Sequence, residues 1–356
     1  MNCRICGHAG LETLGVEAFL FPVRSYAPDF HVFENFICPG CGVVSGQPEP
    51  DDAALGAYYE NAYRTSRDAL TIGGKLIDTP IDLGVGGRSL ARVRSFHDLV
   101  VRNTENIADV QPTENDLVID FGAYQGLFLH GVRQLWGCRC LAYDHSEKGI
   151  AFARDYLGFA ASRVTENIYQ DTFGERARFA TMIHSLEHLR EPLRFLEHLK
   201  TDILRKDGYL YIEIPNLYGM ALCDPTHFFT YSEQSLRHLL ERGGFEVIDI
   251  AVQGFPVVPE FVAHNDEQNI VCLARPAKTS GLKDSSIPVV DLNAIRRRLR
   301  ASYGRHSNAA IGRQFRIALT QGAKFFYYLT FAGILERISP RLSARVLKFI
   351  GRRRAP

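Results

Sequence analysis

Four cysteines near the N-terminus are spaced as two matched pairs. Cys3 and Cys6 form one C-x-x-C pair, Cys38 and Cys41 form a second, and a glycine follows each pair. Such a glycine frees backbone amides to turn toward sulfur, and four thiolates complete the tetrahedral coordination of zinc. We therefore predict a zinc site. The alternative is that these are buried free cysteines without a metal.

Two acids and a glycine-containing turn form a second set. Asp120 lies in an apolar run, Gly122 and Gly126 follow it, and Asp144 ends a second run. The runs indicate parallel strands, and the turn indicates the start of a βαβ unit. A carboxylate at the tip of the second strand can accept hydrogen bonds from both ribose hydroxyls, and the glycines allow the backbone to approach a ligand.

The residues of this turn favour one nucleotide ligand over others. A dinucleotide requires G-x-G-x-x-G directly after the strand, because its pyrophosphate lies on the helix N-terminus. Residues 120–126 instead begin with an acid and contain only two glycines. S-adenosylmethionine has no pyrophosphate, and its ammonium group is suited to an acid at the strand end. We therefore predict S-adenosylmethionine as the cofactor.

The elements that position these residues alternate between strand and helix from residue 116 to about 277. This alternation predicts an α/β fold, a Rossmann-like doubly wound sheet of seven strands. The predicted strands cover 117–121, 140–144, 162–166, 179–184, 208–214, 245–251 and 269–274. The predicted helices cover 89–106, 126–136, 146–156, 192–204 and 232–242.

The chain divides into four predicted units. They are a zinc-binding module at 1–65, a helical connector at 66–115, the cofactor-binding domain at 116–277 and a basic helical extension at 278–356. The first 277 residues carry 24 basic and 37 acidic side chains, whereas the extension carries 17 and 3. Such an extension suits either peripheral contact with an anionic membrane or packing on the protein's own surface.

The location of the protein and the membrane topology of the extension are predicted from apolar content. The first residues lack the apolar core of a secretory signal, so we expect a cytoplasmic protein, with any membrane contact at the inner face. The apolar run at 325–335 is shorter than the roughly 20 residues that a membrane-spanning helix needs.

Residues 116 to about 277 resemble class I S-adenosylmethionine-dependent methyltransferases. The resemblance rests on the turn 120–126, on Asp144, on the segments 183–189 and 208–216, and on Gly-Gly-Phe-Glu at 243–246. It implies that certain residues surround the cofactor. These are Asp120, Gly122, Tyr124 and Gly126 at the methionine portion, Asp144 at the ribose, Asn167 near the adenine and His184 at the edge of the cofactor.

With the N-terminal cysteines included, the chain is similar to the sugar C-methyltransferase branch across residues 1 to about 277. That branch has H-x-x-x-Y-S after the fifth strand, and this chain has His227-Phe-Phe-Thr-Tyr-Ser there. The resemblance implies that His227 is the catalytic base and that Tyr63 contributes to the sugar site. The chain departs from the pattern at Tyr124 and Gln125 and at 224–226, which puts the substrate class in question.

Three functions therefore remain open. The first is methylation of a small hydroxylated or keto substrate, such as C-methylation of a nucleotide-linked sugar, or O- or N-methylation of another small molecule. The second is nucleic-acid methylation, which is disfavoured because residues 184–187 are His-Ser-Leu-Glu rather than the Asn/Asp-Pro-Pro-Tyr/Phe motif of base-modifying enzymes. The third is a binding module that has lost activity, with Tyr124 blocking the pocket.

Overall fold

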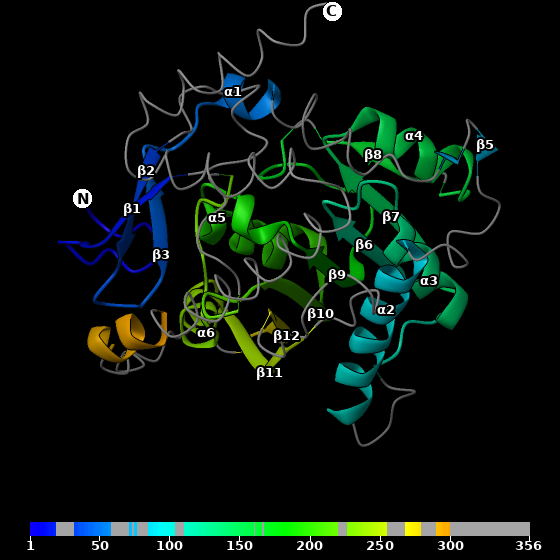
Figure 1. The fold of residues 1–356 in the computed structure, drawn as a ribbon. Coiled ribbons are helices and arrows are strands. Elements are labelled where there is room, and N and C mark those ends of the chain that lie inside the picture. The colour runs from blue at the N-terminus through cyan, green and yellow to red at the C-terminus, as the bar shows by residue number, and fades with distance from the viewer. Residues whose placement is uncertain are drawn as a thin grey trace, which may run out of the picture.

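A seven-stranded sheet forms the centre of the molecule (Figure 1). The computed structural model describes residues 1–18, 32–57, 71–72, 75–76, 85–103, 110–159, 161–165, 167–219, 226–254, 268–278 and 290–299. The strands of the sheet are β6 Leu117–Phe121, β7 Arg139–Asp144, β8 Arg163–Val164, β9 Ala177–Ile183, β10 Leu204–Pro215, β11 Phe245–Gln253 and β12 Asn269–Pro276. Their spatial order is β11-β12-β10-β9-β6-β7-β8.

The pairing of these strands confirms the predicted α/β, Rossmann-like doubly wound fold. The pairs β6–β7, β6–β9, β7–β8 and β9–β10 are parallel, whereas β12 runs antiparallel to both of its neighbours. Strand order reverses between β6 and β9, so the carboxyl ends of these two strands border the crevice in which such sheets bind ligands. Asp120, Asp144 and His184 lie at or beside this carboxyl edge.

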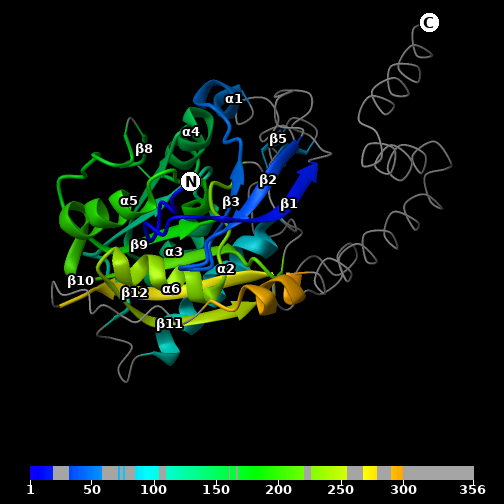
Figure 2. The ribbon, with the colours of Figure 1, turned by 90° about the vertical axis from the view of Figure 1, so that its left-hand side faces the viewer.

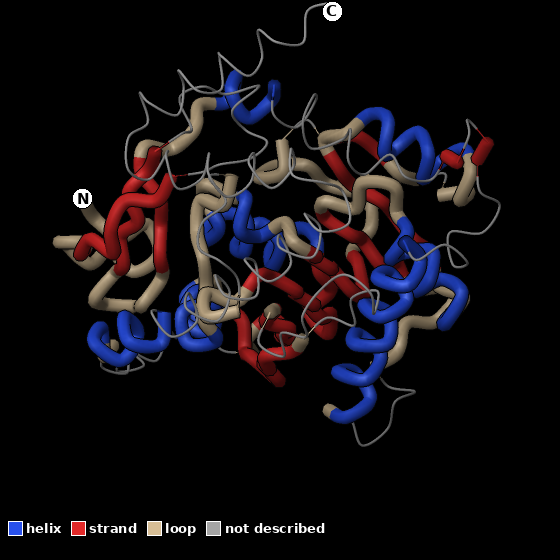
Figure 3. The backbone as a smooth tube through the Cα atoms, viewed as in Figure 1, coloured by secondary structure: helices blue, strands red, loops and turns tan. Residues whose placement is uncertain are grey.

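Helices cover both faces of the sheet (Figures 1 and 3). One face carries α2 Val85–Arg102, α3 Leu127–Trp136 and α4 Glu147–Asp155, and the other carries α5 Pro192–His198 and α6 Glu233–Arg242. Because side chains alternate along a strand, Val118 packs with the first group of helices and Ile119 with the second. Both faces are apolar, as expected for buried parallel strands.

Several elements begin or end at different residues from those predicted. Helix α2 covers Val85–Arg102 rather than 89–106, and β8 has only two residues. The helix predicted at 192–204 ends at His198 and continues as a π turn, Leu199–Ile203. β10 then begins at Leu204 with an irregular register before Tyr209, because the chain passes from this turn into the sheet without a loop.

The N-terminal module is a separate antiparallel sheet beside the α5 and α6 face (Figure 2). Its strands are β1 Glu12–Ala18, β2 Val32–Ile37 and β3 Val44–Gln47, followed by the short helix α1 Asp52–Ala57. A two-stranded sheet follows, formed by β4 Thr71–Ile72 and β5 Lys75–Leu76.

Part of the predicted C-terminal extension packs on this module. Residues 292–299 are helical, and Ile295 and Leu299 join a buried cluster with Ile37 and Val44. The remainder of the extension, including the apolar run at 325–335, lies outside the described residues. Within the described part of the chain, no helix combines the length and the apolarity needed to span a bilayer.

The turn after β6 is packed against the start of α4. The Ser146 hydroxyl accepts a hydrogen bond from the Gly149 amide, which confirms the predicted N-cap of this helix. Gly149 in turn faces the backbone of Tyr124, and a Cβ atom at this glycine would lie 2.9 Å from the Tyr124 carbonyl carbon and oxygen. The absence of a side chain at Gly149 therefore lets α4 approach the turn.

We expect Gly149→Ala to lower the free energy of unfolding by about 1–3 kcal/mol, because the added methyl group would displace the backbone of Tyr124 as well as its ring. Urea denaturation followed by circular dichroism measures this change. The matched control is Gly56→Ala on α1, where a Cβ atom meets nothing within 4 Å. Equal denaturation midpoints for the two variants would contradict the tight packing at Gly149.

Candidate functional site

Strands β6, β7, β9 and β10 bring their polar ends to one crevice. Phe121 pairs with both Tyr143 and Met182, and Ile183 pairs with Glu213, so the four carboxyl ends are level. Three predicted residues, Asp120, Asp144 and His184, therefore lie around the same edge. The sequence predicted their strand positions, and the register brings them together.

The turn between β6 and α3 is held close to the neighbouring strands. The Gly122 amide donates to the Tyr143 carbonyl at 2.8 Å, and Gly122 has φ 84°. A Cβ atom at Gly122 would lie 2.7 Å from the Cβ of Ser185, so only glycine fits. Gly126, with φ 72°, ends the turn and precedes α3. The backbone of this turn is thus exposed to the crevice without intervening side chains at its glycines.

Asp144 organises the amides of two neighbouring segments. Its carboxylate accepts hydrogen bonds from the Tyr124 amide at 2.8 Å and from the Ser146 amide at 2.7 Å. His145 Nδ1 lies 3.3 Å from the same carboxylate, and since a carboxylate offers about four acceptor positions, capacity remains for a further donor such as a hydroxyl group. Asp144 lies at the end of β7, and its role at the ribose stays a prediction.

Asp120 is a buried acid whose side chain forms no ion pair within the described part of the chain. Its side chain is 3% exposed, and its Oδ1 accepts a hydrogen bond from the Thr181 hydroxyl at 2.7 Å. Burial raises the pKa of the Asp120 carboxyl to about 7, with a further increase from the charges of Asp144 and Glu213, while Thr181 acts in the opposite direction. A cationic ligand in the crevice would therefore stabilise the ionised form.

A buried ionic network around Glu213 acts electrostatically on Asp120, and the sequence did not reveal it. Glu213 on β10 is fully buried; its Oε1 accepts from Arg92 Nε at 2.9 Å and lies 3.2 Å from His184 Nε2. Burial lowers the pKa of His184, but Glu187 and Glu213 outweigh this effect and raise it. An acid within an otherwise apolar strand was the available signal for Glu213. Arg92 gave no such signal.

A carboxylate and two imidazoles form a second cluster next to this network. The donor atoms of Glu187, His188 and His227 all lie within 4.8 Å of one another. The rings of His188 and His227 have centroids 4.7 Å apart and are nearly perpendicular. Burial raises the pKa of Glu187, but the His184 imidazole, whose Nδ1 lies 3.5 Å away, and the charges of both clustered histidines lower it further, to about 2. The predicted base His227 thus has an ionised carboxylate beside it.

Two other predicted residues have different outcomes. Asn167 lies after β8. Its side-chain carbonyl accepts a hydrogen bond from the Tyr169 backbone amide at 3.0 Å, and its backbone amide donates to the Asp171 carboxylate. These bonds shape the turn at the carboxyl end of β8, which is compatible with the predicted position near adenine. Tyr63 lies outside the described residues, so its predicted role at the substrate site stays a prediction.

The four N-terminal cysteines converge as predicted. The Sγ atoms of Cys3 and Cys41 are 3.7 Å apart, those of Cys6 and Cys38 are 3.4 Å apart, and all four lie within 4.8 Å of one another. Tetrahedral zinc with bonds of 2.3 Å places its sulfur ligands about 3.8 Å apart. The cluster therefore fits a zinc ion without rearrangement of the fold.

The backbone around each cysteine pair has the same conformation. Gly7 and Gly42 have φ 78° and 74°, and each donates its amide to the carbonyl of Cys3 or Cys38 at 2.8 Å. Hydrogen bonding among the thiols, chiefly from Cys38, lowers the pKa of Cys3 to about 2, and the bond to Cys3 raises the pKa of Cys38 to about 12. All four thiols can ionise together only if a cation compensates them.

The segment that carries His227 lies between this module and the large sheet. Thr230 exchanges backbone hydrogen bonds with Val44 on β3, at 2.8 and 3.1 Å. On its other side, Tyr231 accepts from the Leu217 amide at 2.7 Å, just beyond β10. Residues 226–232 are therefore fixed by backbone contacts to both units.

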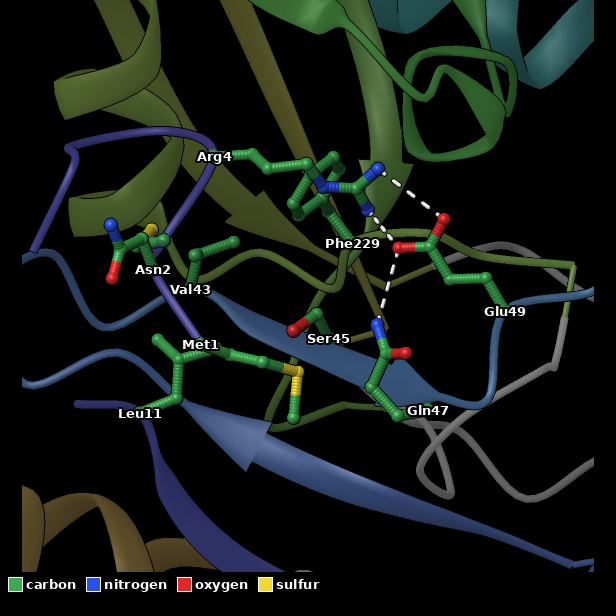
Figure 4. Close-up of a pocket in the computed structure, with 10 residues that line it drawn as sticks. Met1, Asn2, Arg4, Leu11, Val43, Ser45, Gln47, Glu49 and Phe229 are labelled. Atoms are coloured by element: carbon green, nitrogen blue, oxygen red, sulfur yellow. Dashed lines mark hydrogen bonds and ion pairs between the residues drawn. The ribbon is translucent and has the colours of Figure 1, made fainter. Parts of the chain in front are cut away.

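Side chains reinforce this contact around a hollow of about 220 Å³. Figure 4 shows Arg4 extending beside the ring of Phe229, with its guanidinium carbon 4.8 Å from the ring centroid. Arg4 pairs with Glu49, which also accepts a hydrogen bond from Arg190 at 3.0 Å. The module and the segment after Glu187 thus share one carboxylate.

Comparison with known proteins identifies the domain that contains the crevice. Residues 94–250 match the family model described as a methyltransferase domain. No curated protein matches the chain. Magnesium protoporphyrin IX methyltransferase from Synechocystis, solved with S-adenosylmethionine bound, is 15% identical, with 65% of this chain and 100% of that chain covered and a TM-score of 0.42. An S-adenosylmethionine-dependent methyltransferase from Aquifex aeolicus is 20% identical, with 55% and 93% covered and a TM-score of 0.39.

We expect the purified chain to contain about one zinc ion and Cys38→Ser to lose it, because three thiolates leave the tetrahedral site incomplete. Elemental analysis after gel filtration measures the metal content. Cys138→Ser is the control, since Cys138 is equally buried but lies away from the cluster. Unchanged zinc in Cys38→Ser would exclude the cluster as the site.

We expect Asp120→Asn to flatten the pH dependence of stability. The folded carboxyl holds its proton up to about pH 7 and the unfolded one only to about pH 4, so the wild-type free energy of unfolding falls as pH rises between these values. The Asp120 contribution approaches about 4 kcal/mol at 1.36 kcal/mol per pKa unit. Urea titrations at pH 4.5 to 7.5 measure it, with exposed Asp155→Asn as control. Parallel curves for wild type and Asp120→Asn would refute the raised pKa.

Proposed function

We propose that the chain is a class I S-adenosylmethionine-dependent methyltransferase that acts on a small hydroxylated or keto substrate, a proposal supported by the match of residues 94–250 to a methyltransferase domain model. The observation that carries this proposal is the pairing of two adjacent sites. A crevice lined by buried carboxylates suits a cationic cofactor, and a cluster of imidazoles beside it suits an acceptor that must lose a proton.

In this proposal the cofactor lies along the carboxyl edge. Asp120 faces the ammonium group, the backbone from Gly122 to Gly126 faces the methionine portion, and Asp144 accepts from the ribose hydroxyls. Asn167 lies toward the adenine and His184 at the cofactor edge. The proposal is supported by the burial of Asp120, because an uncompensated carboxylate favours a ligand with positive charge.

The acceptor in this proposal is a nucleotide-linked sugar that receives the methyl group on carbon. A carbon atom becomes nucleophilic only after a proton next to a carbonyl group is lost, and an imidazole can promote that loss near neutral pH. His227 is the residue proposed for this task, with Tyr63 at the sugar. The adjacent Glu187 supports it, because a carboxylate can orient an imidazole.

Further features of the proposal rest on the sequence. The reaction takes place in the cytoplasm, zinc fills the cysteine cluster as a structural ion, and the basic residues of 278–356 contact an anionic membrane face. Nucleic acid is not the proposed substrate, because the arginine-rich stretches are confined to that extension.

We expect His227→Ala to lower turnover by at least about 100-fold, because proton transfer by a positioned group contributes a factor of this order or more. The dissociation constant for S-adenosylmethionine should stay within about twofold, since His227 lies outside the cofactor crevice. Labelled S-adenosylmethionine with a panel of nucleotide sugars measures turnover, and calorimetry measures affinity.

The control for this experiment is His97→Ala, on the outer side of α2, which should leave both quantities unchanged. Retention of more than a tenth of the wild-type turnover by His227→Ala would remove His227 from the reaction. If the wild-type chain does not bind S-adenosylmethionine, the proposed function is wrong.

A further inference from the structure

We propose that Glu187, His188 and His227 bind a divalent cation whose open positions take an oxygen atom of the methyl acceptor. The assignment of the acceptor rests on the proposed function, whereas cation binding does not. In this arrangement His227 promotes proton loss through the cation instead of taking the proton itself. The three residues come from two separate segments, 187–188 after β9 and 227 after β10, which the fold brings together.

The carboxylate of Glu187 is the first observation that points to a cation. Its side chain is 1% exposed, and neither of its oxygens makes a hydrogen bond within the described part of the chain. The nearest nitrogen atoms are His184 Nδ1 at 3.5 Å and His188 Nε2 at 4.0 Å. A buried carboxylate with such distant partners is costly unless something compensates its charge.

The orientation of His188 is the second observation. Its Nδ1 lies 2.9 Å from the Thr226 carbonyl oxygen, which can only accept, so Nδ1 must carry the proton and donate. In the neutral ring the lone pair is then on Nε2, which lies 4.0 Å from Glu187 Oε1. Metal-binding histidines are held in this way, with the second ring nitrogen donating to a backbone carbonyl.

The distances among the three donor atoms are somewhat longer than those around a bound metal ion. Metal bonds to imidazole and carboxylate of about 2.0–2.2 Å place ligand atoms roughly 3–3.5 Å apart. The donors now lie within 4.8 Å, and the His188 and His227 rings are already nearly perpendicular. Side-chain rotation is therefore sufficient to bring the donors onto one ion. The backbone of 226–232 stays anchored to Val44 and Leu217.

Two imidazoles and one carboxylate define the kind of ion and leave room for substrate. This set suits zinc, manganese or ferrous iron and supplies only three ligands, so further positions remain open. An acceptor oxygen bound there would have the pKa of its hydroxyl, or of an adjacent C–H group, lowered by the cation. The proton then leaves to water, the bond between methyl carbon and sulfur breaks, and the new bond to the acceptor forms, which produces S-adenosylhomocysteine.

Manganese binding followed by electron paramagnetic resonance tests the site without reference to turnover. The full chain is first loaded with zinc and freed of excess, so that the cysteine cluster is filled. Thiolates bind manganese poorly, so added manganese reports on oxygen and nitrogen ligands. We expect one manganese per chain, with affinity lowered at least tenfold in Glu187→Gln and in His227→Gln.

The controls separate this inference from the proposed function. His97→Gln removes an imidazole outside the cluster and should bind manganese as the wild type does. Circular dichroism establishes that Glu187→Gln folds, and His227→Gln provides a second variant at a less buried position. Calorimetry with S-adenosylmethionine is run on every variant.

Each outcome bears on one hypothesis. Absence of manganese binding at millimolar concentration, or equal binding in all variants, would overturn the cation site, and His188 or His227 would then compensate Glu187 as a protonated imidazole. If the wild type binds manganese but not S-adenosylmethionine, the cation site stands and the proposed function fails.

Discussion

Burial of negative charge at the carboxyl edge of the sheet is the constraint on which the site depends. Asp120, Glu187 and Glu213 are at most 3% exposed, and they lie at or just beyond three neighbouring strands. Arg92 provides nearby positive charge, and both Arg92 and His184 contact Glu213. A buried carboxylate must be paired or protonated, and burial raises the pKa of Asp120 to about 7, so a nearby cation would favour its ionised form near neutral pH. The crevice is therefore most complementary to a ligand that brings its own positive charge, as a sulfonium amino acid does.

The N-terminal module shares a hydrophobic core with the large domain. Cys3, Cys38 and Cys41 pack in one continuous core with α5, α6 and the large sheet. The strand-like contact between Val44 and Thr230 holds the segment of His227 from one side, while Leu217 holds it from the other. A change in the coordination of the cysteines would be transmitted to this segment through a short, buried path. The cysteine cluster and the imidazole cluster are therefore structurally connected.

The sequence predicted the features that depend on local pattern. The strand at Leu117–Phe121, the serine cap at Ser146 and the convergence of the cysteines follow from periodicity, capping chemistry and spacing. The pairing of Arg92 with Glu213 spans 121 residues and leaves no periodic signal, so it required the fold. The packing of residues 292–299 also required the fold. Their apolar side chains can be seen in the sequence, but the surface that they cover could not be predicted from it.

Backbone conformation shows how this site is kept ready for a ligand. Among the described residues, Tyr124 and His184 are the non-glycine residues with positive φ, at 47° and 51°. This conformation costs free energy in residues with side chains, so neighbouring contacts must impose it. Asp144 binds the amide of Tyr124, and the Glu213 carbonyl accepts from the amide of His184, both at 2.8 Å. The strain is therefore held by adjacent strands of the sheet.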